Sequence, residues 1–84
     1  MRLQKDSVLY DIGSGTGSIA VEAARLSKGI KVYAIEKKEE AVALLAQNKE
    51  KFQTANMEII RGTAPEAFNG LEKPTHVFIG GSGG

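Results

Sequence analysis

Three glycines at alternating positions follow an apolar segment near the start of the chain, and this arrangement constrains the fold most strongly. Residues 8–12 are apolar except for Asp11, as expected of a β-strand that is buried on both faces. Gly13, Gly15 and Gly17 permit a tight turn and a close ligand approach at the first turn of a helix. The N–H groups and partial positive charge there suit a ligand carboxylate, so the turn predicts a site for a nucleotide-like ligand.

Two ligands compete for this turn, S-adenosylmethionine (SAM) and a nicotinamide dinucleotide. A dinucleotide site spaces its glycines as G-x-G-x-x-G, but the third of these positions is Ser18. The carboxylate of Asp11 would repel a pyrophosphate and attract the ammonium group of a methionine moiety. The residues therefore favour SAM, and a plain glycine-rich loop without a ligand is the alternative.

A second carboxylate, Glu36, directly follows the apolar segment at residues 31–35. It falls about 20 residues past the glycine turn, which is typical of a carboxylate that binds ribose hydroxyls. A charge run also begins here, and such runs usually face water. Because ligands bind at the carboxyl ends of parallel strands, we expect Glu36 to face the ligand and residues 37–40 to lie on the surface.

Strands and helices alternate along the chain, which predicts a parallel sheet with right-handed crossovers and helices on both faces. The hydrophobic pattern predicts strands at residues 7–12, 31–35, 57–61 and 76–79, and helices at residues 17–27 and 39–54. The apolar positions of the first helix are Ile19, Ala20, Val21, Ala23, Ala24 and Leu26. The core-facing stripe of the second comprises Val42, Leu45, Lys49 and Phe52, with Ala41, Leu44 and Asn48 beside it. Residues 63–66 have the spacing of a capping box, which predicts a short helix that ends at Asn69 and Gly70.

Composition excludes several function classes. A length of 84 residues indicates one small domain. The chain has no cysteine and one histidine, which exclude disulfides, thiolate metal sites and a histidine-based metal centre. Its 11 basic and 10 acidic residues form no basic stripe for nucleic acid, and no apolar run approaches the ~20 residues of a membrane span. We therefore expect a cytoplasmic protein with neither nucleic-acid nor membrane partners.

Three segments carry a resemblance to a known family: residues 3–22 around the glycine turn, residues 62–67 with the pattern G-x-A-P-E, and residues 77–84, a strand ending in G-G-S-G. The chain resembles class I SAM-dependent methyltransferases, and more narrowly the cobalt-precorrin-6B methyltransferase (decarboxylating) family of cobalamin biosynthesis. The resemblance covers essentially all 84 residues. It implies a Rossmann-like parallel sheet of strand order 3-2-1-4, a single SAM-binding half-domain over residues 1–84, and a parent enzyme that methylates and decarboxylates a corrin precursor.

The family pattern also implies a cofactor site, and it assigns no catalytic residue. The implied cofactor-binding residues are Asp11, Gly13, Ser14, Gly15, Thr16, Gly17, Glu36, Thr63, Ala64, Gly80 and Gly81. By this resemblance the glycine turn and Asp11 face the methionine part of SAM, and Glu36 binds the ribose hydroxyls. Thr63 and Ala64 border the adenine, and Gly80 and Gly81 lie beneath the sulfonium.

Two positions depart from the family pattern. Relatives commonly carry an aspartate where this chain has Thr63, which puts a carboxylate contact to the adenine amine in doubt. Thr63 is then a helix cap, an adenine neighbour or both. Relatives often have an acidic residue where His76 stands, and we interpret His76 as a strand-end residue without a chemical role, because no partner is visible for it.

The resemblance implies that a segment before the first strand and three strands after the fourth are missing. We expect the chain alone to lack most of the acceptor site and to be inactive. The open edge at residues 76–79 would then pair with a second copy and give a homo-oligomer. Two other interpretations stay open: a fragment of a nicotinamide-dinucleotide enzyme, and a folding or structural fragment in which Gly80–Gly84 is partly a linker.

Overall fold

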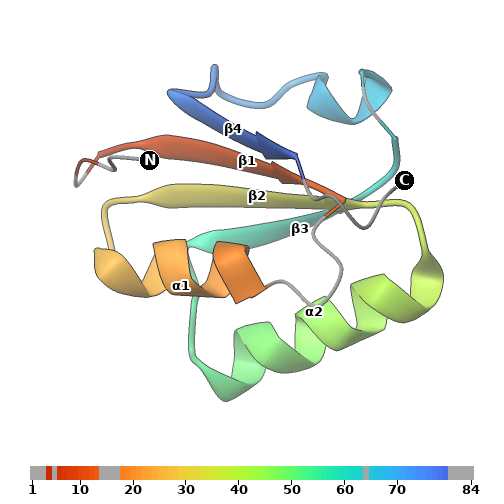
Figure 1. The fold of residues 1–84 in the computed structure, drawn as a ribbon, viewed down its shortest axis with the longest axis horizontal. Helices are drawn as coiled ribbons and strands as arrows, with labels where there is room; N and C mark the ends of the chain where they lie inside the picture. Colours follow the sequence, from red (N-terminus) through yellow and green to blue (C-terminus); the bar gives the residue numbers. More distant parts are fainter. Residues whose placement is uncertain (1–3, 5, 14–17, 64, 80–84) are drawn as a thin grey trace.

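Four parallel strands form one sheet in the order β3-β2-β1-β4 (Figure 1). The computed structural model describes residues 4, 6–13, 18–63 and 65–79. The strands have the following bounds: β1 Val8–Ile12, β2 Lys31–Glu36, β3 Met57–Arg61 and β4 His76–Ile79. The predicted strand order is confirmed. β1 begins after Ser7 because that residue forms a turn, in which its N–H donates to the Gln4 carbonyl at 3.1 Å.

Both α-helices lie on one face of the sheet, and a 3-10 turn lies on the other (Figure 1). Their bounds are α1 Ser18–Leu26, α2 Glu39–Lys51 and η1 Glu66–Phe68. The steps from β1 to β2 and from β2 to β3 run in the same direction, so right-handed crossovers place α1 and α2 on the same face. The connection from β3 to β4 steps back and crosses the opposite face. We predicted helices on both faces of the sheet. Both α-helices lie on one face, and the other face is covered by the short 3-10 turn alone among the described helical elements.

The end of α2 differs from the predicted boundary at residue 54. Gln53 adopts a left-handed backbone conformation with φ of 53°. Its N–H donates to the Glu50 carbonyl at 3.3 Å, and the Thr54 N–H donates to the Lys49 carbonyl at 3.1 Å. These two bonds form a Schellman motif, which ends the helix although the helical pattern of the sequence continues.

The capping box predicted at residues 63–66 is wrong. Pro65 precedes η1, and no side chain caps the turn. Thr63 contributes through its backbone, because its carbonyl oxygen accepts a hydrogen bond from the Ala67 N–H at 2.9 Å. A turn of three residues leaves its first N–H groups close to water, which satisfies them without a side-chain cap.

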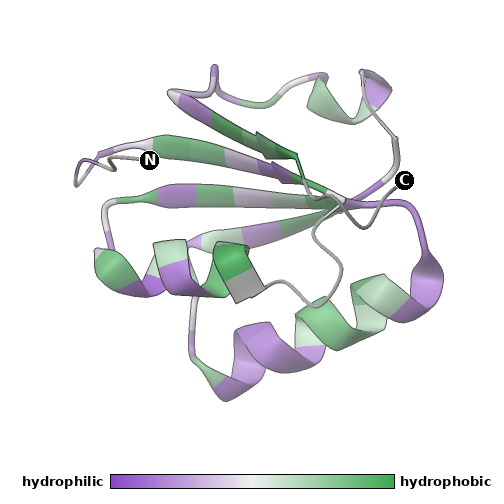
Figure 2. Ribbon diagram, in the orientation of Figure 1, coloured by the Kyte–Doolittle hydropathy of each residue, from purple (hydrophilic) through white to green (hydrophobic). Residues whose placement is uncertain are grey.

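The helix-side core packs strand residues against the small side chains of α1. Its buried members are Leu9, Ala20, Val21, Ala23, Ala24, Ile30, Val32, Ala34, Leu45 and Met57. Alanines bring α1 close to the sheet, whereas α2 buries only Leu45 completely. Figure 2 shows the hydrophobic residues of α2 in its middle and hydrophilic residues at both ends.

Three residues that the helical pattern placed on apolar faces are exposed. Leu26 is 70% exposed at the last position of α1, and Leu44 is 46% exposed on the outer side of α2. Phe52 is 38% exposed because it follows the last residue of α2. The Arg25 guanidinium lies 5.2 Å from the centroid of the Phe52 ring, so a cation covers this ring from α1.

A smaller aromatic cluster fills the opposite face of the sheet. Tyr10 and Tyr33 meet edge to face with their centroids 5.6 Å apart, and the ring of Phe68 lies 5.0 Å from Tyr10. The Tyr10 hydroxyl donates a hydrogen bond to the Glu72 carbonyl. Tyr10 thereby attaches the connection between β3 and β4 to the centre of the sheet.

On the same face, the apolar side chains of β4 are less covered. Val77 is 52% exposed and Ile79 is 71% exposed. β4 stands at one edge of the four-stranded sheet that the described residues form. The pairing of this edge with a second copy stays a prediction.

Asn56, which precedes β3, satisfies carbonyl groups at and beyond the end of α1. Its Nδ2 donates to the carbonyl oxygens of Ala24 at 3.0 Å, Ser27 at 3.1 Å and Ile30 at 2.6 Å. Asn56→Asp would replace this donor by an oxygen that faces three acceptors. We expect it to lower the free energy of unfolding by about 2–3 kcal/mol, as measured by urea denaturation. The same change at exposed Asn69 is the control, and equal losses in both variants would contradict this role.

Candidate functional site at the carboxyl ends of the strands

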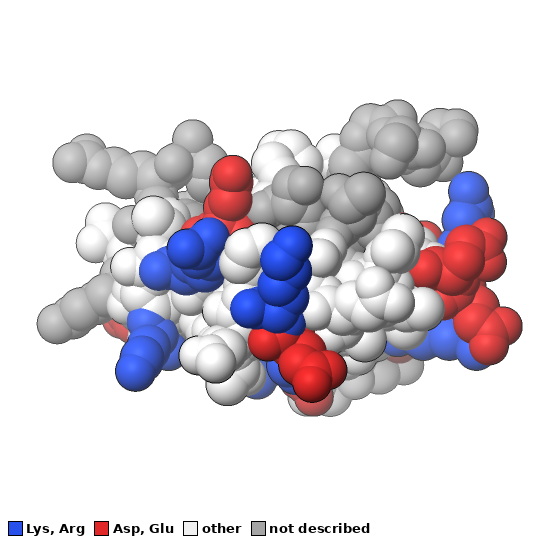
Figure 3. Space-filling view, turned by 90° about the horizontal axis from the view of Figure 1, so that it is seen from below, with Lys and Arg blue, Asp and Glu red and all other residues white. Residues whose placement is uncertain are grey.

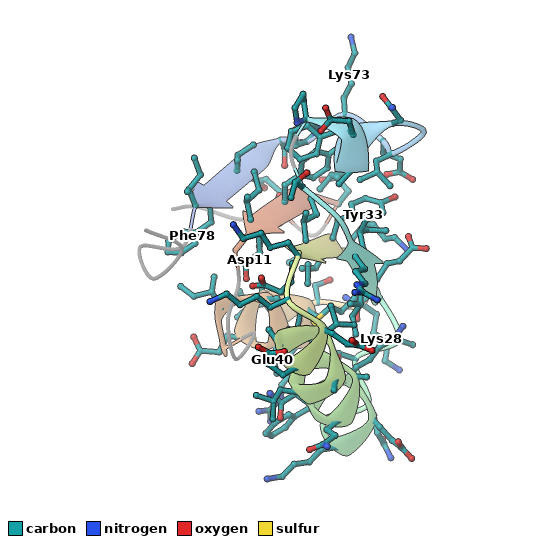
Figure 4. The ribbon with its side chains drawn as sticks, turned by 90° about the vertical axis from the view of Figure 1, so that its right-hand side faces the viewer. Asp11, Lys28, Tyr33, Glu40, Lys73 and Phe78 are labelled. Atoms are coloured by element: carbon teal, nitrogen blue, oxygen red, sulfur yellow. The ribbon has the colours of Figure 1, made fainter. Side chains whose placement is uncertain are left out.

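Four predicted site residues meet at the edge of the sheet where the parallel strands end. Gly13 directly follows β1, and its N–H donates to the Ile35 carbonyl of β2 at 2.8 Å. The Gly62 N–H, after β3, donates to the Glu36 carbonyl at 3.0 Å. These bonds bring the residues after β1 and β3 to the end of β2. Thr63 directly follows Gly62 in the chain. Figure 4 looks onto this edge, with Asp11 near its centre.

Asp11 is a buried carboxylate on the helix side of β1. It is 1% exposed, and it lies between Ala34 of β2 and Phe78 of β4 in the sheet register. One hydrogen bond comes from the Ala20 backbone N–H in the first turn of α1. Within the described part of the chain, its Oδ2 atom is buried and has no hydrogen-bond partner. An acceptor of this kind is expected to receive a donor from outside these residues.

The electrostatic state of Asp11 follows from its surroundings. Burial raises the pKa of Asp11 from its ordinary value of 3.8 to about 6. The Ala20 N–H lowers that pKa, and the charge of Glu36 raises it. Perturbed carboxyl groups of this kind often mark functional sites, because burying a charge without a partner is costly.

Glu36 ends β2 and is held by the backbone of the residues that follow it. It is 7% exposed, and its Oε1 accepts hydrogen bonds from the N–H groups of Lys37 at 2.9 Å and Lys38 at 3.2 Å. Its burial argues against the alternative of a solvated charge at this position, and its predicted role toward ribose hydroxyls stays a prediction. The side chains of Lys37 and Lys38 are exposed, as expected.

Gly13 provides the close backbone approach that a ligand needs. Its φ is 67°, a left-handed conformation that glycine adopts without strain. A Cβ atom built on Gly13 would meet nothing within 4 Å among the described residues. Among the described residues, the backbone of Gly13 is therefore free to be approached closely by another group.

Of the other residues that the sequence singled out, two lie in the described part of the chain. Thr63 is exposed beside this edge. His76 begins β4 at the opposite edge of the sheet, where its Nδ1 lies 2.7 Å from the Thr75 hydroxyl. In the sheet register His76 pairs with Leu9, two residues before Asp11. The remaining predicted positions lie outside the described residues: Ser14, Gly15, Thr16, Gly17, Ala64, Gly80 and Gly81.

Sequence reasoning missed the backbone groups that hold the two carboxylates. The Ala20 N–H binds Asp11, and the Lys37 and Lys38 N–H groups bind Glu36. The alternation of β1 could have placed Asp11 on the same face as Leu9, and hence toward α1. No side-chain pattern indicates a backbone donor, so the individual partners could not have been found in that way.

Other kinds of site find no support in the described ranges. They contain no group of three His, Cys, Asp or Glu residues that could hold a metal ion, and no helix there is long and apolar enough to cross a membrane. Figure 3 views the helix side and shows acidic and basic residues interspersed on it. A groove between α2 and β3, lined in part by Ala46, Gln53 and Ile59, does not include the site residues. The carboxyl edge of the sheet is therefore the candidate site.

Comparisons with known proteins agree with the fold and with the predicted family. A family model described as a precorrin methyltransferase domain matches residues 1–84. A protein of Pyrobaculum calidifontis named "Probable cobalt-precorrin-6B C(15)-methyltransferase (decarboxylating)" is 45% identical over 99% of this chain and 44% of its own length. A cobalt-precorrin-6B C(15)-methyltransferase (decarboxylating) of Salmonella typhimurium is 42% identical over all of this chain and 43% of its own.

A solved structure shows the same fold. The precorrin-6y C5,15-methyltransferase of Geobacter metallireducens superimposes with a TM-score of 0.91 and 38% identity, over 99% of this chain and 44% of that one. The chain thus spans less than half the length of these relatives. The resemblance inferred from the glycine turn and the G-x-A-P-E segment is confirmed.

Proposed function

The chain belongs to the precorrin methyltransferase domain family, and from this membership we propose that it is the SAM-binding part of an enzyme that methylates a corrin precursor in cobalamin biosynthesis. The names of the relatives support a reaction at C15 with decarboxylation. The observation that carries the proposal is the buried Asp11 carboxylate, whose Oδ2 lacks a partner in the described region, at the strand ends shared with Glu36 and Gly13. Over residues 1–84 we propose a single half-domain with this role.

Each residue in this site would make a different contribution. Asp11 would attract the ammonium group of the methionine moiety, and Gly13 would let it approach the backbone. Glu36 would accept hydrogen bonds from the ribose hydroxyls, in an orientation set by the N–H groups of Lys37 and Lys38. Thr63 would border the adenine. SAM, when bound, supplies an electrophilic methyl group on its sulfonium.

The site residues favour SAM over a nicotinamide dinucleotide. A pyrophosphate carries negative charge, and the buried carboxylates Asp11 and Glu36 would repel it more strongly than exposed ones would. The family membership points the same way. A comparison of the affinities of this protein for SAM and for NAD therefore distinguishes the two possibilities.

We expect Glu36→Gln to weaken SAM binding by about 1–3 kcal/mol, as measured by isothermal titration calorimetry. Glutamine keeps one oxygen that can accept from the Lys37 and Lys38 N–H groups, so the fold should persist. Its amide nitrogen replaces a carboxylate oxygen and cannot accept from a ribose hydroxyl. Glu40→Gln removes the same charge from an exposed position at the start of α2 and should bind normally. Equal affinities of all three proteins, or tighter binding of NAD than of SAM, would contradict the proposal.

A further inference from the structure

The described site holds two buried carboxylates, and the charge of one acts on the other. Asp11 and Glu36 are 1% and 7% exposed, and they come from neighbouring strands. Of the charged groups that the structure describes, Glu36 is the one that acts on Asp11. The register neighbours of Asp11 are Ala34 and Phe78, and neither titrates. The titratable residue of β4 is the half-buried His76, which pairs with Leu9 two residues before Asp11.

Helix α1 contributes a backbone donor to Asp11 and no buried charge. From α1 it receives the Ala20 backbone N–H, and the charged side chains of this helix, Glu22 and Arg25, are exposed. A buried carboxylate in such surroundings is stabilised either by a proton or by a cation from outside.

A proton and a cationic ligand group would both bind to the same atom, the unpartnered oxygen of Asp11. Asp11 Oδ1 and Oδ2 share one carboxylate, and the buried Oδ2 has no hydrogen-bond partner in the described residues. This oxygen can be satisfied either by a proton or by an ammonium group that donates to it, and each would remove the need for the other. We propose that the methionine ammonium of the ligand and a proton compete for Asp11, so that binding releases the proton to solvent. This inference rests on the proposed function for the identity of the ligand.

The pH dependence follows from the free protein. The pKa of Asp11 is about 6, so about one carboxyl group in eleven is ionised at pH 5 and about ten in eleven at pH 7. If only the ionised form binds the ammonium, the apparent association constant equals the intrinsic constant multiplied by the ionised fraction. The affinity is then about tenfold weaker at pH 5 than at pH 7. The sign is the one expected when bound cation lowers the pKa of a carboxyl group.

Two ligands that differ in the amino-acid part separate this mechanism from a general effect of acid. S-adenosylhomocysteine carries the ammonium group, whereas 5′-methylthioadenosine keeps the adenosine and lacks it. Calorimetry at pH 6, in buffers of different ionisation enthalpy, counts the protons released. For S-adenosylhomocysteine we expect about half a proton per ligand at pH 6 and less than about a tenth at pH 8. For 5′-methylthioadenosine we expect no release and the same affinity at pH 5 and pH 7.

The Asp11→Asn variant is the second arm. Asparagine keeps an oxygen for the Ala20 N–H and cannot ionise, so its weaker binding of S-adenosylhomocysteine should not change between pH 5 and pH 7. Carbon NMR of the Asp11 carboxyl group in the unsubstituted chain gives the same information without a variant. Its pKa should fall when S-adenosylhomocysteine saturates the protein.

The outcomes distinguish this inference from the proposed function. Binding of S-adenosylhomocysteine that is equally tight at pH 5 and pH 7, or an Asp11 pKa that the ligand leaves unchanged, would overturn the inference alone. An equal pH dependence with 5′-methylthioadenosine would also overturn it, because the ammonium would not be the competing group. Absence of binding at pH 8, where Asp11 is ionised, would overturn the proposed function and the inference together.

Discussion

The Asp11→Asn variant should have a higher free energy of unfolding than the unsubstituted chain at pH 7, by up to about 3 kcal/mol. The folded pKa of about 6 lies above the ordinary value of 3.8, so the folded state binds a proton more tightly than the unfolded state does. The fold is then less stable above pH 6 than below pH 4 as far as this group is concerned. Asparagine removes the buried charge and keeps an acceptor for the Ala20 N–H.

Urea denaturation at pH 7 and pH 4 measures this effect. The gain from Asp11→Asn should be large at pH 7 and small at pH 4, where the aspartate is already protonated. Asp6→Asn, at an exposed turn, makes the same chemical change and should leave stability within about 0.5 kcal/mol. A variant that is less stable at pH 7 would show that the buried carboxylate stabilises the fold. The expected loss of ligand affinity together with a gain in stability is typical of functional sites.

Leu45→Ala should have the largest destabilising effect, a loss of about 2–5 kcal/mol in the free energy of unfolding. Leu45 is fully buried and is the one residue of α2 that is classed as buried in the structure. Truncation would leave a cavity between α2 and the sheet, where α1 already contributes only small side chains. Chemical denaturation measures the loss.

Leu44→Ala is the matched control for this prediction. Leu44 is 46% exposed on the same helix, so its truncation should cost about 0.5 kcal/mol or less. Similar losses at both positions would mean that α2 packs on the sheet through a different face. If Leu45→Ala lowers the free energy of unfolding without changing its slope against denaturant concentration, the fold stays intact.

Strand positions and their order could be predicted from the sequence because two physical rules act together. Short apolar runs such as residues 31–35, which alternate with helical patterns along the chain, are typical of the buried strands of a parallel sheet. The handedness of the crossovers then leaves few orders for four strands. The ends of the helices were less predictable, because they depend on single backbone conformations such as the left-handed Gln53.

The positions of Asp11 and Glu36 in the candidate site could be predicted from the sequence, whereas their contacts could not. The spacing of Asp11 and Glu36 relative to strand ends indicated that both carboxylates lie at one edge of the sheet. Their burial and their backbone partners depend on how α1 and the residues after β2 pack, which the pattern of side chains does not contain. The capping prediction for Thr63 was wrong because the turn begins after Pro65 without a side-chain cap, which the spacing of residues 63–66 does not reveal.

The central claim is that an adenosyl cofactor binds at the carboxyl ends of β1 and β2. Titration of the isotopically labelled chain with S-adenosylhomocysteine, followed by amide chemical shifts in NMR, tests this claim most directly. We expect the largest shifts at Asp11, Gly13, Glu36 and Lys37, whose amides lie at this edge. Shifts centred on Ala46 and Ile59 in the groove between α2 and β3, or no shifts at saturating ligand, would contradict it.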